Sequence, residues 1–152
     1  MLSIHSDEHF MKLALKEAQK AYEEDEIPVG AVVVWNNQVI AKAHNTSERL
    51  NDATAHAEMI ALTAASNHIG NKFLNECTLY VTLEPCPMCA GAIFWTRIKR
   101  LCYAASDDKN GFMRFGKEML HGKTKVQYGL MAEQAADLMT VFFKNKRKKN
   151  TR

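Results

Sequence analysis

The sequence contains no apolar stretch near the roughly 20 residues that a helix needs to cross a bilayer. Its first residues, Met1 to Glu8, lack the basic start and the apolar centre of a secretion signal. Repeats, low-complexity segments and linkers are also missing, which favours a single domain over residues 1–152. In a chain that is not exported, four cysteines are expected to be thiols or metal ligands rather than disulfides. These absences predict a cytoplasmic protein of one domain with no membrane association.

Positive charge is concentrated at one end of the chain. The net charge is +3, and the tail over 144–152 holds six basic residues and no acidic one. Without these six cations the rest of the chain would carry a net charge of −3. A basic end usually serves as a solvated segment that keeps a protein dispersed, but it can also bind a polyanion such as RNA. Composition alone leaves both interpretations open.

Hydrophobic periodicity predicts alternating helices and strands. Ser6 is placed to cap a first helix, and Asn36-Asn37 can form the tight turn of a hairpin between strands over 30–35 and 38–43. Further elements are expected as helices over 56–66, 86–96 and 131–146, and as strands over 78–82, 101–104 and 125–128. This order predicts an α/β domain of three layers, with a sheet covered by helices.

Two predicted helix starts carry the residues with metal and proton chemistry. His56 and Glu58 lie at one start, and Cys86 and Cys89 lie at the other. Backbone N–H groups and the helix dipole favour thiolates at a helix start, and one imidazole with two thiolates suits zinc. Three protein ligands leave a fourth position for water, so we expect one catalytic zinc per chain. A carboxylate at Glu58 would then move protons.

Each part of this pattern has a second interpretation when taken alone. A Cys-x-x-Cys pair at a strand-to-helix junction is also typical of thioredoxin-like redox sites, and a single histidine is usually structural. The combination of His-x-Glu with Pro-Cys-x-x-Cys is instead the signature of zinc-dependent nucleobase deaminases. We therefore predict hydrolytic deamination. Cys77 and Cys102 lie in apolar strands and are expected to be buried.

With these residues in view, the chain resembles the bacterial tRNA-specific adenosine deaminases of the cytidine/deoxycytidylate deaminase superfamily. The resemblance runs nearly from end to end and includes the segments 26–32, 44–45, 52–58 and 80–93. It implies a cytidine-deaminase-like fold with a central mixed five-stranded sheet between helices. It further implies a homodimer that converts the wobble adenosine of a tRNA anticodon loop to inosine.

The resemblance also implies roles for individual residues. The zinc ligands would be His56, Cys86 and Cys89, and Glu58 would be the proton shuttle. On the substrate side, Asn45 would form a hydrogen bond with the nucleoside, and the backbone of Ala57 would contact the edge of the base. Asp107 would lie beside the RNA strand, and Phe142 or Phe143 would help to form the wall of the pocket.

The segment after the fourth strand departs from the family pattern. Ser106 stands where a basic residue is frequent, and 108–115 replaces a run of small residues. Phe112 and Phe115 can be a stacking platform for unpaired bases or part of the core, and the sequence does not separate these alternatives.

The zinc motifs themselves also allow other functions. Free-base deaminases such as guanine deaminase share them and have an aromatic residue near Phe94-Trp95. A free nucleobase or nucleoside deaminase is therefore the second hypothesis. A third hypothesis is an RNA-binding subunit with a structural zinc, but such a site has no use for Glu58.

Overall fold

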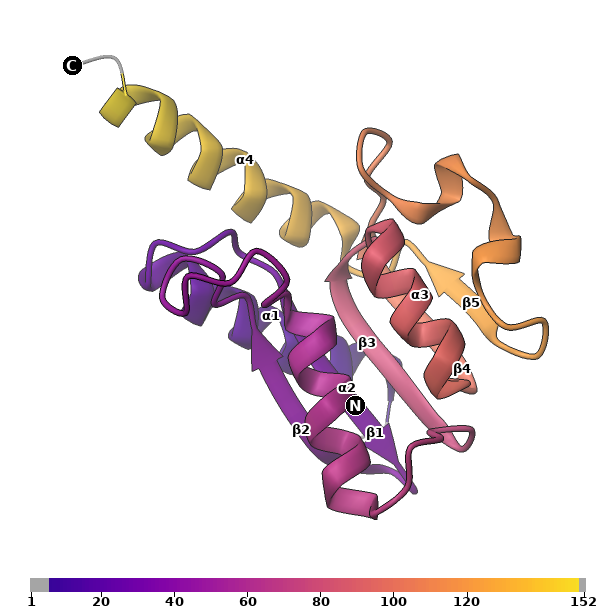
Figure 1. Ribbon diagram of the computed structural model, residues 1–152. Helices are drawn as coiled ribbons and strands as arrows, with labels where there is room; N and C mark the ends of the chain where they lie inside the picture. Colours follow the sequence, from indigo (N-terminus) through magenta and orange to yellow (C-terminus); the bar gives the residue numbers. More distant parts are fainter. Residues whose placement is uncertain (1–5, 151–152) are drawn as a thin grey trace.

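The computed structural model describes residues 6–150 and the side chains of residues 6–148. Helices and strands follow the predicted order, and two short 3-10 turns, Phe112–Arg114 and Lys117–Met119, lie between the last two strands (Figure 1). The helices are α1 (Asp7–Glu23), α2 (Ala57–Ile69), α3 (Pro87–Thr96) and α4 (Ala132–Asn150). The strands are β1 (Gly30–Trp35), β2 (Gln38–His44), β3 (Cys77–Leu83), β4 (Arg100–Ala105) and β5 (Lys125–Tyr128).

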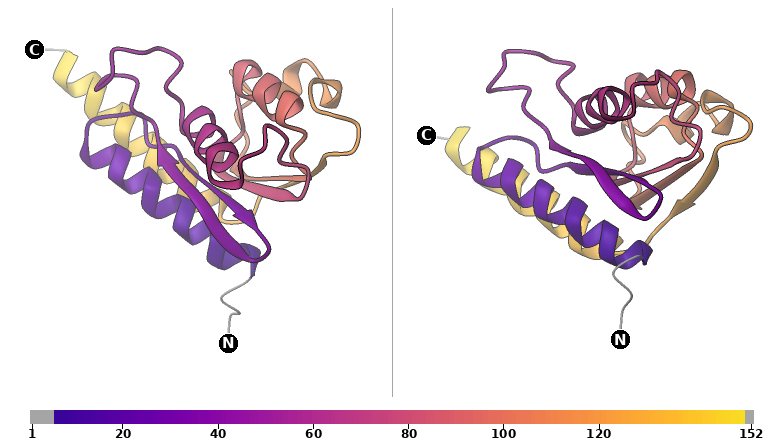
Figure 2. Two further views of the ribbon diagram at one scale, coloured as in Figure 1. Left: turned by 60° about the horizontal axis from the view of Figure 1, so that its bottom comes forward. Right: turned by 90° about the horizontal axis from the view of Figure 1, so that it is seen from below.

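The five strands form one mixed sheet in the order β2-β1-β3-β4-β5. Strand β1 pairs antiparallel with β2 and β3, whereas β3–β4 and β4–β5 are parallel. Helices α1 and α4 run side by side on one face of the sheet, and α2 and α3 cover the other (Figure 2). The predicted three-layer α/β/α fold with a mixed five-stranded sheet is confirmed.

Local signals in the sequence place the first elements. The Ser6 side chain accepts a hydrogen bond from the His9 N–H at 3.1 Å and so caps α1. Asn36 and Asn37 have φ values of 51° and 60°, which a two-residue hairpin turn requires. Gly30 lets α1 approach the sheet, because a Cβ there would lie 2.1 Å from the Ala14 carbonyl oxygen.

A separate apolar cluster fills each side of the sheet. The cluster under α2 and α3 includes Leu79, Tyr103 and Phe112, and the one under α1 and α4 includes Met11 and Val32. Cys77 and Cys102 are both buried, as expected. None of the helices between residues 6 and 150 is both long enough and apolar enough to cross a membrane.

The basic tail is largely a continuation of α4, which reaches Asn150 rather than ending near residue 146. Helix α4 packs against α1, where the Asn145 side-chain amide donates to the Tyr22 hydroxyl at 3.0 Å and Lys146 forms an ion pair with Asp25 at 2.9 Å. Residues 151–152 lie outside the described part of the chain. At least seven residues of the tail, 144–150, are therefore held in a helix.

Candidate active site

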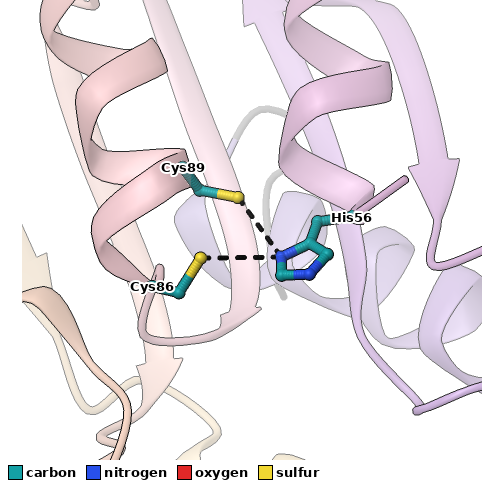
Figure 3. Close-up of side chains that lie close together, drawn as sticks. All are labelled: His56, Cys86 and Cys89. Carbon is teal, nitrogen blue, oxygen red and sulfur yellow. Dashed lines mark hydrogen bonds between the residues drawn. The ribbon is translucent and has the colours of Figure 1, made fainter. Parts of the chain in front are cut away.

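The predicted metal ligands lie at the N-termini of two adjacent helices. His56 is the N-cap residue of α2, and Cys86 is the N-cap residue of α3. Pro87 begins α3, where the missing N–H of a proline costs nothing, and Cys89 follows in the first turn. The two cysteine side chains point from α3 toward the imidazole at the start of α2 (Figure 3).

The distances between these ligand atoms fit a zinc ion. Nδ1 of His56 lies 3.6 Å from Sγ of Cys86 and 3.5 Å from Sγ of Cys89. All three atoms lie within 4.8 Å of one another. Tetrahedral coordination with Zn–S near 2.3 Å and Zn–N near 2.05 Å places nitrogen and sulfur about 3.6 Å apart. A hydrogen bond with the Ala53 backbone contributes to the raised pKa of the imidazole, and metal-binding histidines usually have such a second partner.

Hydrogen bonds among the three groups stabilise one thiolate. The pKa of Cys86 falls to about 4, mainly because its thiolate accepts a hydrogen bond from Cys89. The same hydrogen bond raises the pKa of Cys89, and contact with Cys86 raises that of His56. A thiolate beside a thiol and an imidazole is the soft ligand set that binds zinc when the remaining protons leave.

Glu58 lies within the same site but is not part of the ligand cluster. Its side chain is on the first turn of α2 and is 4% exposed. Burial is the main cause that raises the pKa of Glu58 to about 7, although the neighbouring His56 partly opposes it. A carboxylate with a pKa near neutrality can both accept and return a proton, which is the behaviour that a general acid–base requires.

These residues lie in a cavity of about 830 Å³. The metal-binding side contributes His56, Glu58 and Cys86, and the predicted substrate-side residues Asn45, Asp107 and Phe143 also line it. Ala57 is buried beneath the wall, where its N–H donates to Oδ1 of Asn45 at 2.7 Å. The structure thus brings together most of the residues that were predicted separately from the sequence.

Comparison with known proteins assigns the family. Residues 4–105 match the sequence model of the cytidine and deoxycytidylate deaminase zinc-binding region. The chain belongs to this deaminase family. A relative named tRNA-specific adenosine deaminase, from Aquifex aeolicus (strain VF5), is 43% identical over 145 residues, which is 92% of this chain and 95% of the relative. The redox interpretation of the cysteine pair is therefore set aside.

Solved structures agree with this assignment. One, from a study of A-to-I editing by tRNA:A34 deaminases at the wobble position of transfer RNA, has a TM-score of 0.80 and 43% identity. The match covers 86% of this chain and 98% of that one. A guanine deaminase from Bacillus subtilis has a TM-score of 0.64 and 42% identity, with 66% of this chain and 65% of that chain covered. Both of these solved structures therefore come from work on proteins named as deaminases.

The structure separates the two adjacent phenylalanines of α4. Phe143 is 42% exposed and lines the cavity of this deaminase domain. Phe142 is 5% exposed, and its ring packs against Tyr22 of α1 at a centroid distance of 6.1 Å. Adjacent helical residues point about 100° apart, so only one of the pair can face the cavity directly.

The aromatic residues after β4 are separated in the same way. Phe112 is fully buried and meets the Tyr103 ring edge-on at 6.1 Å, so a stacking role for Phe112 is wrong. Phe115 is 62% exposed, with the Arg114 guanidinium 4.8 Å from its ring centroid. Phe112 and Phe115 thus lie three residues apart in one short segment, yet the first ring is buried and the second is exposed to solvent.

Three basic side chains on the cavity wall are not among the predicted site residues. We call Lys109, Arg114 and Arg147 the basic rim; all three are exposed and line the cavity. Arg147 belongs to a row of residues on α4 whose spacing follows the helical period. That spacing is the sequence signal from which Arg147 could have been predicted to face the cavity. The row consists of Ala136, Met139, Thr140, Phe143 and Arg147.

Proposed function

We propose that this protein is a zinc-dependent hydrolytic deaminase that converts adenosine to inosine at the wobble position of a tRNA. The observation that carries the proposal is that one cavity is lined both by Glu58 and two of the metal-binding residues, His56 and Cys86, and by the basic rim. The basic rim suits a substrate with phosphates on either side of the reacting base. The 43% identity to a named tRNA-specific adenosine deaminase over most of the chain supports the same substrate.

The proposed reaction adds water to the purine ring and releases ammonia. Bound zinc, held by His56, Cys86 and Cys89, would make hydroxide available near neutral pH. Glu58 accepts the proton from the attacking water and delivers it to the ring nitrogen next to the reacting carbon. Glu58 then takes the remaining proton from the hydroxyl group added to that carbon and passes it to the amino group, so the carbon–nitrogen bond breaks, ammonia leaves and a carbonyl group forms. Burial of Glu58 supports this role, since it keeps the carboxyl pKa near the working pH.

The other cavity residues would bind and orient the nucleotide. The Asn45 oxygen is occupied by the Ala57 N–H, so its amide NH₂ group is the part that can donate to the nucleoside. Through the same bond Ala57 would fix the orientation of Asn45. Asp107 and Phe143 would contribute to the walls beside the RNA strand, and the basic rim would contact flanking phosphates. Phe142 would support Phe143 from behind.

A free-base deaminase is the second candidate, because the guanine deaminase of Bacillus subtilis is 42% identical over two thirds of this chain. The deciding assay compares kcat/KM for an anticodon stem-loop with kcat/KM for free guanine, cytosine and adenosine. Faster turnover of the stem-loop is expected, with inosine and ammonia formed in equal amounts. Faster turnover of any free base or nucleoside would reverse the assignment. Tight RNA binding without ammonia release would indicate a non-catalytic subunit.

The proposal extends to assembly and compartment. We expect a homodimer, and the adjoining rings of Phe94 and the 75% exposed Trp95 on α3 are a candidate part of its interface, because contiguous exposed apolar surface marks interaction sites. Sedimentation or light scattering measures the mass directly. A tRNA substrate and four free thiols support action in the cytoplasm.

A further inference from the structure

A second buried carboxylate lies in the cavity wall and has no part in the proposed chemistry. Glu84 directly follows β3 and is 6% exposed. Its Oε1 accepts a hydrogen bond from the Asp107 N–H at 3.1 Å, and its Oε2 accepts one from the Met113 N–H at 3.0 Å. Both oxygens therefore bind backbone amides of the segment that follows β4.

That segment wraps closely around the carboxylate. A Cβ at Gly111 would lie 1.8 Å from Oε2 of Glu84, so only glycine leaves room at this position. The φ of Gly111 is −73°, an ordinary value, which means that space rather than backbone conformation requires glycine here. The Phe112 N–H also donates to the Pro85 carbonyl at 2.9 Å and joins the segment to the residue before Cys86.

The residues between these two anchored amides, together with the residue on either side of them, form part of the cavity wall. Those that line it are Ser106, Asp107, Lys109, Asn110 and Arg114. Of the three basic-rim residues, Lys109 thus lies on the loop that Glu84 holds, and Arg114 directly follows the anchored Met113. Side chains on a loop hold a substrate well only when the backbone beneath them is held in place.

We infer that Glu84 is a positioning residue that fixes the 107–113 loop in its substrate-binding conformation and so sets affinity for the nucleic acid flanking the reacting base. The same arrangement recurs on the opposite loop. There Glu26 is 1% exposed and accepts the Glu48 and Arg49 N–H groups, each at 2.9 Å. A buried carboxylate therefore supports each of the loops at Ser47 and at Asp107, which both line the cavity.

The test substitutes Glu84→Gln and separates binding from turnover. An amide oxygen can accept one of the two N–H groups, but the amide NH₂ then faces the other donor, so one hydrogen bond remains and the other is replaced by repulsion. The expected result is a rise of about 10-fold or more in KM for the anticodon stem-loop, with kcat within about 3-fold of wild type and an unchanged zinc content. A fall in kcat at unchanged KM would overturn the inference.

Hydrogen exchange gives a second measurement that needs no substrate. In Glu84→Gln, peptides covering 105–116 should exchange faster, whereas those covering 45–56 should not change. Unchanged exchange at 105–116 would overturn the inference. The kinetic measurement rests on the proposed function, whereas hydrogen exchange does not. If the substrate proved to be a free base, the proposed function would be wrong, but the effect of Glu84 on the loop could still be measured by exchange.

Two further variants make the result decisive. Gly111→Ala forces the loop away from Glu84 while keeping the carboxylate, so it should reproduce the higher KM and the faster exchange, and it decides the question if Glu84→Gln does not fold. The matched control is Glu17→Gln, which removes another buried carboxylate, one that pairs with Lys20 and His44 on the α1 side. It should leave KM unchanged. An equal rise in KM for the control would show a general loss of stability and overturn the inference.

Discussion

Replacing Phe112 and Phe115 separately by alanine should have opposite consequences for stability and binding. The Phe112 side chain is fully buried against Tyr103 and the α2/α3 cluster. Phe→Ala at such a position costs about 3–5 kcal/mol of unfolding free energy. For a domain of this size each kcal/mol corresponds to about 2–4 °C, so Tm should fall by about 6–20 °C. Phe115 is 62% exposed, and its removal should change stability by less than about 0.5 kcal/mol.

Substrate binding, in contrast, should depend on the exposed ring of Phe115. If Phe115 stacks on an unpaired base of the substrate, its removal costs about 1–3 kcal/mol and raises KM by between about 5-fold and 150-fold. Thermal unfolding and initial rates on an anticodon stem-loop, measured for both variants at one salt concentration, provide the comparison. A Tm for Phe112→Ala within about 2 °C of wild type would refute the burial argument. An unchanged KM for Phe115→Ala would refute stacking.

Four further predictions concern the site and the charged groups. Glu58→Gln should keep fold and zinc but lose about 100-fold or more in kcat, since an amide cannot shuttle a proton; near-normal activity would remove Glu58 from the mechanism. Purified protein should contain about one zinc per chain, and full activity of metal-free protein would contradict a metal-assisted reaction. Deleting 144–152 should weaken tRNA binding and reduce the salt slope of log K by about 0.7–0.9 for each phosphate that the tail neutralises, and an unchanged slope would mean that the tail neutralises none. A hydrogen bond from Arg100 lowers the pKa of Asp7, so this pair stabilises the fold fully above about pH 4 and loses its effect as pH falls through the lower pKa of the folded state. Asp7→Asn should therefore reduce the pH dependence of stability in acid unfolding curves. A curve parallel to that of the wild type would contradict this role of the pair.

The sequence predicted the order of the elements and the metal-binding cluster because both depend on local patterns. Helical and strand periods are repeated over many residues, and the spacing of Cys86 and Cys89 within one helical turn fixes their relative positions before any tertiary contact forms. His56 could be added because its own motif places it at a helix start. The limits of α4 were less accurate, since helical residues continue through the basic tail to Asn150 without a stop signal.

Other features depend on contacts between distant segments, and the sequence gives no direct signal for them. Phe142 and Phe143 look equivalent on a helical pattern, and only the position of Tyr22 on α1 decides which ring is covered. The role of Glu84 depends on amides 23 and 29 residues further along the chain. Loop conformations of this kind follow from the packed structure and not from local propensity.

The position of the three metal ligands also affects the unfolded chain. His56 is 30 residues from Cys86 and 33 residues from Cys89. The histidine lies at the start of α2, and the two cysteines lie at the start of α3. An ion bound by all three therefore closes a loop that contains all of α2 and β3, in the manner of a removable disulfide. Loop-closure entropy for this length is worth roughly 3.5–4 kcal/mol, a large part of the stability of an ordinary domain. The ion that enables the chemistry thus also acts as a reversible cross-link, and chelation should lower the unfolding temperature as well as the rate.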